Sequence, residues 1–170
     1  LSLRRQRQMC IRDSICTAQA LLAIMAGFYA AYHGPKGLKQ IAQSVSSKAN
    51  ALATKINELG YDLRSSVFFD TISIHTKSQT QEIFSAANDQ LINIRMLDED
   101  HISISLDETT TNQEVNKIVK LFKPIERKEK VIMSFDLPVD LQRSSKYLTH
   151  PVFHMYLSLI HISEPTRRRG

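Results

Sequence analysis

The stretch ICTAQALLAIMAGFYAAYHGPKGL, residues 15–38, decides the fold. It has no charged side chain from Ile15 to Tyr32 and is rich in alanine, so it predicts a buried helix from about Thr17 to Tyr32. Gly34 and Pro35 should break this helix and start another, because proline is well tolerated at the first position of a helix. The rest of the chain is expected to pack on this segment and to follow from it.

A second helix is expected directly after the break. Its apolar residues are spaced three and four apart, which is typical of an amphipathic helix with one buried stripe. These residues are Leu38, Ile41, Val45, Ala49, Leu52, Ile56 and Leu59. Gly60 follows the last of them, where a left-handed glycine commonly ends a helix.

A strand and a third helix come next. Residues 67–75 are rich in aromatic and β-branched side chains, which predicts a strand. Ser78 and Gln81 have the spacing of a capping box and predict a helix that continues to about Leu91. Its buried side would consist of Ile83, Phe84, Ala87 and Leu91.

The following pattern predicts a hairpin and a last helix. Apolar and polar residues alternate over 92–96 and 101–106, on either side of the acidic turn 98–100. Thr111 and Glu114 form another capping box, before a helix with Val115, Ile118, Val119 and Phe122 on its apolar stripe. This order predicts an α+β fold, a two-layer sandwich of a small mixed or antiparallel sheet with helices on one face.

The basic character of the chain belongs to its ends. The 170 residues carry a net charge of +5. Four arginines and one aspartate leave +3 on residues 1–14, and three arginines and one glutamate leave +2 on residues 154–170, so residues 15–153 are neutral. Both ends resemble translated vector sequence, and we expect them to be non-native tails. The alternative, basic arms that bind nucleic acid, is disfavoured because no aromatic residues interleave with the arginines.

The cysteine count and the apolar run place the chain in a broad class. Cys10 and Cys16 are too few for a disulfide framework, which indicates a reduced, intracellular setting. The apolar run 20–31 is too short to cross a bilayer, so no membrane association is expected.

Several kinds of site lack their residues. The only glycines are at 27, 34, 37, 60 and 170, so no glycine-rich loop is present to cradle a phosphate. No cluster of histidine, cysteine and carboxylate residues has the spacing of metal ligands. The acidic turn 98–100 lacks the spacing and the glycine of a calcium loop.

Two pairs of residues are candidates for a site. Cys16 and Thr17 fall at the expected start of the first helix, where they would either cap the helix and bury a small thiol or line the lip of a cleft. A thiol at that position would have a lowered pKa and could sense oxidants. Thr149 and His150 lie in a loop, where a histidine is most often simply solvated. His33, before Gly34, is expected to end the first helix.

Five blocks, in order and at plausible spacing, resemble the glycine dehydrogenase (decarboxylating) family, the P-protein of the glycine cleavage system. They are ICTAQALLA from Ile15, YHGPKGL from Tyr32, FFDTISI from Phe68, ISISLDET from Ile102 and LTHPVF up to Phe153. The resemblance covers about four-fifths of this chain and a small part of a P-protein. It departs from the family before Ile15 and after Phe153.

The resemblance implies a place in the parent protein. Residues 15–123 would be a helix leading into a small α/β domain, like the small domain of a type I pyridoxal-phosphate enzyme. Residues 124–153 would be a connector, followed by the tail 154–170. The segment would come from the amino-terminal half, so the Schiff-base lysine and the pyridoxal phosphate would belong to the missing half.

The resemblance also implies an activity and partners. The parent enzyme would decarboxylate glycine and pass the aminomethyl group to the lipoyl arm of the H-protein, and this chain alone would be inactive. Its partners would be the remainder of the P-protein or a partner subunit, in an oligomeric, cytoplasmic bacterial enzyme. Cys16, Thr17, Thr149 and His150 would lie near the active site, with none of them catalytic. The alternative is a small ligand-binding regulatory α/β domain without catalysis.

Overall fold

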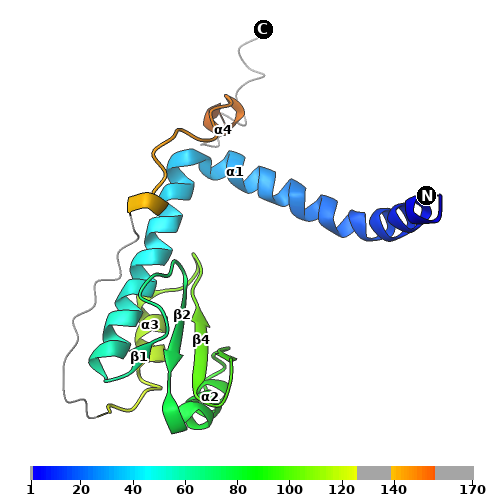
Figure 1. Ribbon diagram of the computed structural model, residues 1–170. Coiled ribbons are helices and arrows are strands. Elements are labelled where there is room, and N and C mark those ends of the chain that lie inside the picture. Colours follow the sequence, from blue (N-terminus) through cyan, green and yellow to red (C-terminus); the bar gives the residue numbers. More distant parts are fainter. Residues whose placement is uncertain (1, 126–138, 156–170) are drawn as a thin grey trace. The chain divides into compact units, whose positions relative to one another are not determined.

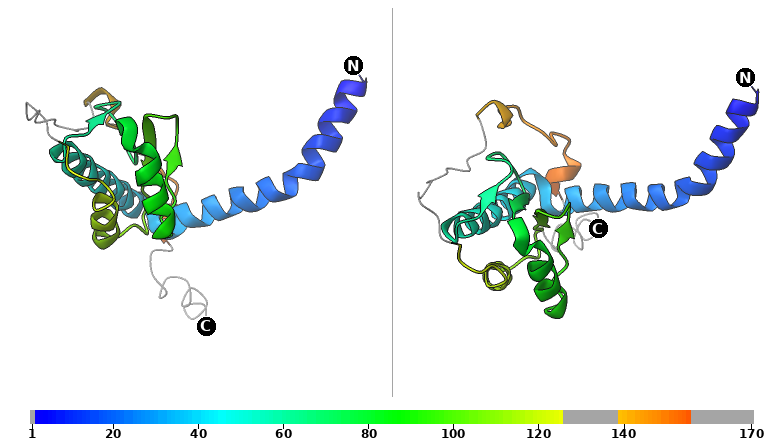
Figure 2. Two further views of the ribbon diagram at one scale, coloured as in Figure 1. Left: turned by 90° about the horizontal axis from the view of Figure 1, so that it is seen from below. Right: turned by 60° about the horizontal axis from the view of Figure 1, so that its bottom comes forward.

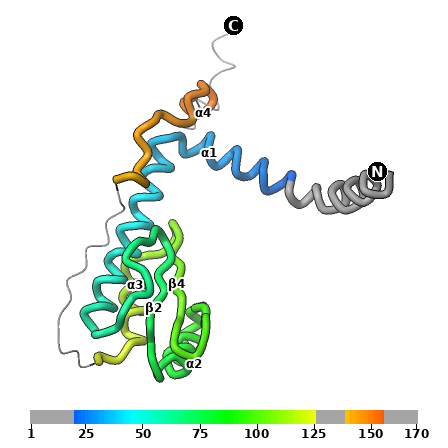
Figure 3. Tube along the Cα trace, in the orientation of Figure 1, coloured from blue at the N-terminus to red at the C-terminus, as the bar shows by residue number. Residues whose placement is uncertain are grey.

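The computed structural model describes residues 2–125 and 139–155, and the side chains of residues 20–125 and 139–155 (Figures 1 and 3). Contacts divide the chain into two compact units. We call them the terminal unit, Leu1–Lys39 with Ser145–Gly170, and the sheet unit, Gln40–Ser144.

The first helix, α1, runs over Ser2–Glu58 and has non-helical backbone angles only at Gly34 (φ 62°, ψ 178°). Glycine adopts positive φ without a steric penalty, and Pro35 can begin the next helical segment because its missing N–H needs no partner there. The predicted break is therefore confirmed. The predicted start at Thr17 is wrong, because α1 begins at Ser2. Residues 2–14 contain no glycine or proline, and they include four arginines and two glutamines, which favour helix.

The end of α1 has the predicted glycine. Gly60 has φ 97°, its N–H bonds the Asn57 carbonyl at 3.0 Å, and the Tyr61 N–H bonds the Ile56 carbonyl at 3.3 Å. This pair of hydrogen bonds is a Schellman motif, which satisfies carbonyls that the helix leaves without partners.

The sheet has four strands in the order β1-β2-β4-β3, and every pair is antiparallel. The strands are β1 (Asp62–Leu63), β2 (Thr71–His75), β3 (Arg95–Met96) and β4 (His101–Ser105). The α+β class is confirmed, and the sheet is antiparallel rather than mixed. The strand expected over 67–75 begins at Thr71, and the two-residue β1 is too short to give a periodic signal.

The helix between β2 and β3 starts differently from the prediction. A 3-10 turn, η1 (Lys77–Gln79), precedes α2 (Thr80–Asp89), whose N-cap makes no side-chain hydrogen bond, so the capping box Ser78–Gln81 is absent. The turn is instead held by Thr76 and Thr80, whose buried hydroxyls lie 2.6 Å apart. The expected burial of Leu91 is also wrong: it is 95% exposed, with φ 56°, just after the helix ends.

The remaining elements are α3 (Asn112–Val119), the 3-10 turn η2 (Val139–Leu141) and α4 (Val152–Met155). The capping box of α3 is confirmed, since Thr111 and Glu114 bond each other's backbone N–H groups. The last turns of α1 lie beside α3 in the three views of Figures 1 and 2, and Lys55 Nζ donates to Asn116 Oδ1 at 2.6 Å.

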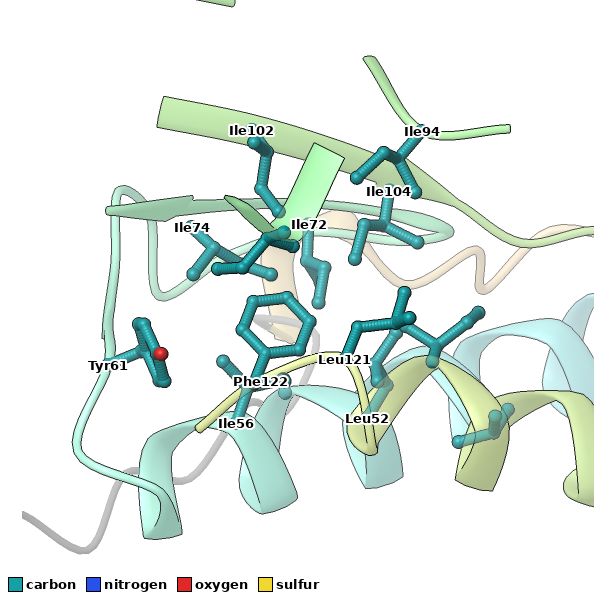
Figure 4. Packing of buried hydrophobic residues seen from close by; sticks show 14 of the residues in the cluster. Leu52, Ile56, Tyr61, Ile72, Ile74, Ile94, Ile102, Ile104, Leu121 and Phe122 are labelled. Atoms are coloured by element: carbon teal, nitrogen blue, oxygen red, sulfur yellow. The ribbon is translucent and has the colours of Figure 1, made fainter. Parts of the chain in front are cut away.

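The core of the sheet unit lies between the sheet and the helices. Ile72 and Ile74 of β2 point toward Leu52 and Ile56 of α1, and Phe122 fills the space beside them (Figure 4). Tyr61 is fully buried, and its ring packs edge-on against Phe122 with centroids 5.2 Å apart. The predicted stripe of the second helix is confirmed at Val45, Ala49, Leu52 and Ile56, which are all buried.

Candidate functional site

Two blocks that are far apart in the sequence meet in the terminal unit. The hydroxyl of Tyr147 donates a hydrogen bond to the carbonyl oxygen of Pro35, across 112 positions. Pro35 belongs to the YHGPKGL block, and Tyr147 directly precedes LTHPVF. This contact fixes the carboxy-terminal loop against the break in α1, so the two blocks form one local site.

The break itself is closely packed. His33 is the last residue before Gly34, as expected, and its ring contacts Tyr29 with centroids 4.3 Å apart and Tyr32 at 5.0 Å. A Cβ placed on Gly37 would lie 3.1 Å from His33 Cβ, so a larger residue there would press on the His33 side chain at its Cβ. The missing side chain of Gly37 thus leaves room for His33.

The loop after Tyr147 is shaped by its own backbone and by His150. Leu148 has φ 49°, an uncommon conformation for a residue with a branched side chain. The Leu148 carbonyl accepts from His154 Nε2 at 3.1 Å. The N–H of Val152 donates to His150 Nδ1 at 3.2 Å, at the start of α4.

That last bond decides which nitrogen of His150 carries the proton. An imidazole nitrogen that accepts a hydrogen bond is unprotonated, so the neutral ring bears its proton on Nε2. Both Thr149 and His150 are exposed. The loop therefore offers a hydroxyl and an imidazole N–H donor to any group that comes against it.

The other candidate pair lies elsewhere on the chain. Cys16 and Thr17 are inside α1, which begins at Ser2. They are not at a helix N-terminus. The position therefore supports neither the expected helix cap nor the lowered thiol pKa that a helix N-terminus would cause. At 1.5 Å per residue, Thr17 is about 25 Å of helix away from Gly34. The structure does not bring this pair to the loop of His150.

The histidines of the sheet unit form a pair that the sequence did not reveal. His75 and His101 are directly opposite each other on β2 and β4, with rings stacked 4.9 Å apart. These are the two central strands, so neither histidine is at the sheet edge. Asp98 Oδ1 lies 2.8 Å from His101 Nδ1, and this hydrogen bond is the main cause that lowers the Asp98 pKa.

The aspartates of the two acidic turns accept hydrogen bonds from their own turns. Residues 98–100 form the hairpin turn that was predicted, with Asp98 Oδ1 accepting from the Asp100 N–H at 2.9 Å. Asp107 Oδ1 accepts from the backbone and hydroxyl groups of Thr109 and Thr110 at 2.8–3.0 Å, and these bonds lower the Asp107 pKa. Within residues 20–125 and 139–155, no group of three or more metal-ligating side chains could hold a metal ion.

The described part of the chain does not fit pyridoxal phosphate. Its lysines are all exposed or half-buried, whereas a Schiff-base lysine needs a desolvated site that depresses its pKa. Two glycines have positive φ, Gly34 and Gly60, and a Cβ on Gly60 would meet the Ile125 carbonyl, so its space is taken by the chain itself. No cradle for a phosphate is formed by these residues.

Comparison with known proteins defines the class. A family model described as glycine cleavage system P-protein matches residues 2–122. The chain is 43% identical over 164 residues to a glycine dehydrogenase (decarboxylating) of Pelagibacter ubique, covering 93% of this chain and 17% of the relative. The proteins of the same name from Flavobacterium johnsoniae and a Nostoc species are 43% and 42% identical, each over 86% of this chain and 16% of the relative.

The sequence and fold thus define an α+β segment of a class of longer proteins. The chain spans about one-sixth of the length of these relatives. The chain belongs to the glycine cleavage system P-protein family. The match begins at residue 2, inside the stretch that we expect to be a tail. Whether residues 1–14 are native stays a prediction. Among the described residues, no helix has both the length and the apolarity to cross a membrane.

Proposed function

We propose that this chain is part of a glycine dehydrogenase (decarboxylating), an oxidoreductase that decarboxylates glycine and passes the aminomethyl group to the lipoyl H-protein. The observation that carries the proposal is the 43% identity to a relative of that name over 93% of the chain. The regulatory-domain alternative is not favoured, because the family match extends over both helix α1 and the sheet unit.

Pyridoxal phosphate is assigned to the part of the parent that this chain lacks. The lysines among the described residues, which are exposed or half-buried, support that assignment. In the parent, residues 15–123 form the helix and the small domain, and residues 124–153 form the connector. The parent is an oligomeric, cytoplasmic enzyme whose other partner is the remaining half or subunit.

The loop of Thr149 and His150 is the part of this chain that we place beside the active site. The Tyr147–Pro35 hydrogen bond supports this, because it holds the loop against a second family block. His150 is exposed and its Nδ1 accepts from the Val152 N–H, so the ring can donate through Nε2 while it keeps this bond. Cys16 and Thr17 remain candidates for a position near the active site only because they belong to the same terminal unit.

A chimera tests the proposal. The aligned segment of the full-length Pelagibacter ubique relative is replaced by this chain, and glycine–bicarbonate exchange is measured with and without pyridoxal phosphate. We expect exchange by the chimera and none by the 170-residue chain alone. A folded chimera without exchange, beside an active parent relative, would contradict the proposal.

Two substitutions separate a role at the site from a role in the loop. His150→Asn keeps an acceptor for the Val152 N–H but removes the imidazole, whereas His150→Ala removes both. If His150 faces the active site, both variants of the chimera lose at least roughly tenfold in exchange rate. If only the alanine variant loses activity, His150 serves the loop alone and its place beside the active site is refuted.

A further inference from the structure

The helical stretch 20–32 of α1 has no polar face. Six large apolar side chains are each between 55% and 72% exposed: Leu21, Leu22, Ile24, Met25, Phe28 and Tyr32. At about 100° per residue they span an arc of roughly 160°. We call this the bulky face.

The opposite arc consists of small residues. They are Ala20, Ala23, Ala26, Gly27, Ala30 and Ala31, and none of them is buried. A Cβ placed on Gly27 would have no atom within 4 Å. We call this the alanine face, and no charged residue separates it from the bulky face.

A helix that is apolar all round is stable in water only when it is enclosed, either in a large protein core or in a membrane. Among the described residues, no helix meets the length and hydropathy of a membrane span. Protein is therefore the cover that this helix requires, and two differently shaped surfaces are needed, one for each face.

The length of the relatives indicates which protein covers this helix. The helix lies inside the family match, yet the chain covers only 16–17% of the relatives' length. We propose that residues 20–32 are an internal core helix of the full-length polypeptide, sandwiched between segments outside these 170 residues. One segment presents an apolar groove to the bulky face, and the other is a helix that packs closely on the alanine face. This inference shares with the proposed function only the premise that the chain is part of a longer P-protein.

Hydrogen exchange tests the enclosure. The amide exchange of residues 20–32 is compared between the 170-residue chain and the full-length chimera described above. We expect exchange at least about 100-fold slower in the chimera, since an enclosed helix exchanges only through larger openings. Equal rates in the two would overturn the proposal. Should the chimera not fold, the aligned helix of the unaltered relative must show the same slow exchange, and fast exchange there would overturn it too.

Matched variants test each face. Leu22 and Leu141 are 64% and 63% exposed, so Leu141→Gln serves as a control that removes a leucine of similar exposure outside the helix. In the chimera, only Leu22→Gln should speed the exchange of residues 20–32, by about tenfold or more. Gly27→Leu should slow helix exchange in the isolated chain, because leucine favours helix, and speed it in the chimera, because the alanine face is covered. The same sign in both would refute a cover on that face.

Three outcomes separate the rival explanations. If the isolated chain forms a stable dimer with residues 20–32 protected, and Leu22→Gln dissociates it, then a second copy covers the helix and the proposal is wrong. If the helix is protected in a chimera that lacks glycine–bicarbonate exchange, the proposed function fails and this inference stands. If the chimera is active but the helix is unprotected, this inference fails and the proposed function stands.

Discussion

The hydroxyl of Tyr147 donates to the carbonyl oxygen of Pro35, so the loop before α4 is tied to the break in α1. The bond joins two residues separated by 112 positions, within one compact unit. It is the contact that makes a site out of two sequence blocks.

Replacing Tyr147 with phenylalanine removes this bond while keeping the ring. The expected cost is about 0.5–1.5 kcal/mol, the net contribution of an ordinary hydrogen bond, felt locally in residues 145–155. Limited proteolysis of that loop should become faster, while urea unfolding of the sheet unit stays unchanged. Unaltered cleavage of the loop would mean that the bond does not hold it.

Gly60→Ala should destabilise the sheet unit. Gly60 has φ 97°, which alanine adopts at a cost, and the new Cβ would overlap the Ile125 carbonyl oxygen. We expect a loss of roughly 2 kcal/mol or more in the free energy of unfolding, measured with urea. The matched control is Gly27→Ala, where the Cβ has open space, and helicity should stay equal or rise. Equal effects of the two changes would contradict this account.

Tyr61→Phe should remove a buried polar anchor. The Tyr61 hydroxyl lies 2.6 Å from Gln79 Oε1 and 2.9 Å from the Lys123 carbonyl oxygen, and the side chain is fully buried. The one O–H proton that these two acceptors share would be lost, at a cost of about 1–3 kcal/mol in urea unfolding. A cost near zero would indicate that water replaces the hydroxyl.

The same residue predicts an alkaline limit. Burial, the largest cause, raises the Tyr61 pKa above 10.0, so the folded state holds the proton more tightly than the unfolded state. The resulting stabilisation is complete below pH 10 and is lost as the pH rises through the folded pKa. The chain should therefore lose stability above about pH 10, and Tyr61→Phe should reduce this loss. Identical alkaline profiles for both proteins would exclude Tyr61 as its source.

Acid should weaken the turns around α3. The Glu114 pKa is lowered below 4.5, mainly by the Thr111 backbone N–H, and the Asp107 pKa is lowered below 3.8 by the Thr109 and Thr110 hydroxyls. Groups with a lowered folded pKa stabilise the fold above their unfolded pKa, and this stabilisation is lost as the pH falls through the folded pKa. Urea midpoints should drop below about pH 4.5. Asp107→Asn keeps an acceptor without the charge and should flatten part of that slope.

Local patterns predicted most elements of the sheet unit. The stripe of Val45 and Ile56, the glycine at 60 and the box of Thr111 with Glu114 each depend on residues a few positions apart, so the sequence shows them directly. The start of α1 was missed, because its first residues have high helix propensity without apolar periodicity.

Local sequence patterns could not predict contacts between residues that are far apart in the sequence. Tyr147 with Pro35, and His75 with His101, depend on which distant segments the fold places together. The Thr76–Thr80 hydroxyl pair displaced the expected Ser78–Gln81 box for a similar reason, since burial of both threonines decides the turn. The candidates Thr149 and His150 could be found from the blocks of residues, but the proton position on His150 required the Val152 N–H.

The close approach at Gly60 has a consequence for the architecture of longer relatives. The Ile125 N–H bonds the Leu59 carbonyl at 2.8 Å, so the polypeptide enters and leaves the strand-bearing segment at one point. A segment whose two ends meet can be carried as a cassette, because its own folding sets no distance that the flanking chain must span. The segment between Leu59 and Ile125 can thus be exchanged as one block when the last turns of α1 go with it, because Leu52 and Ile56 complete its core.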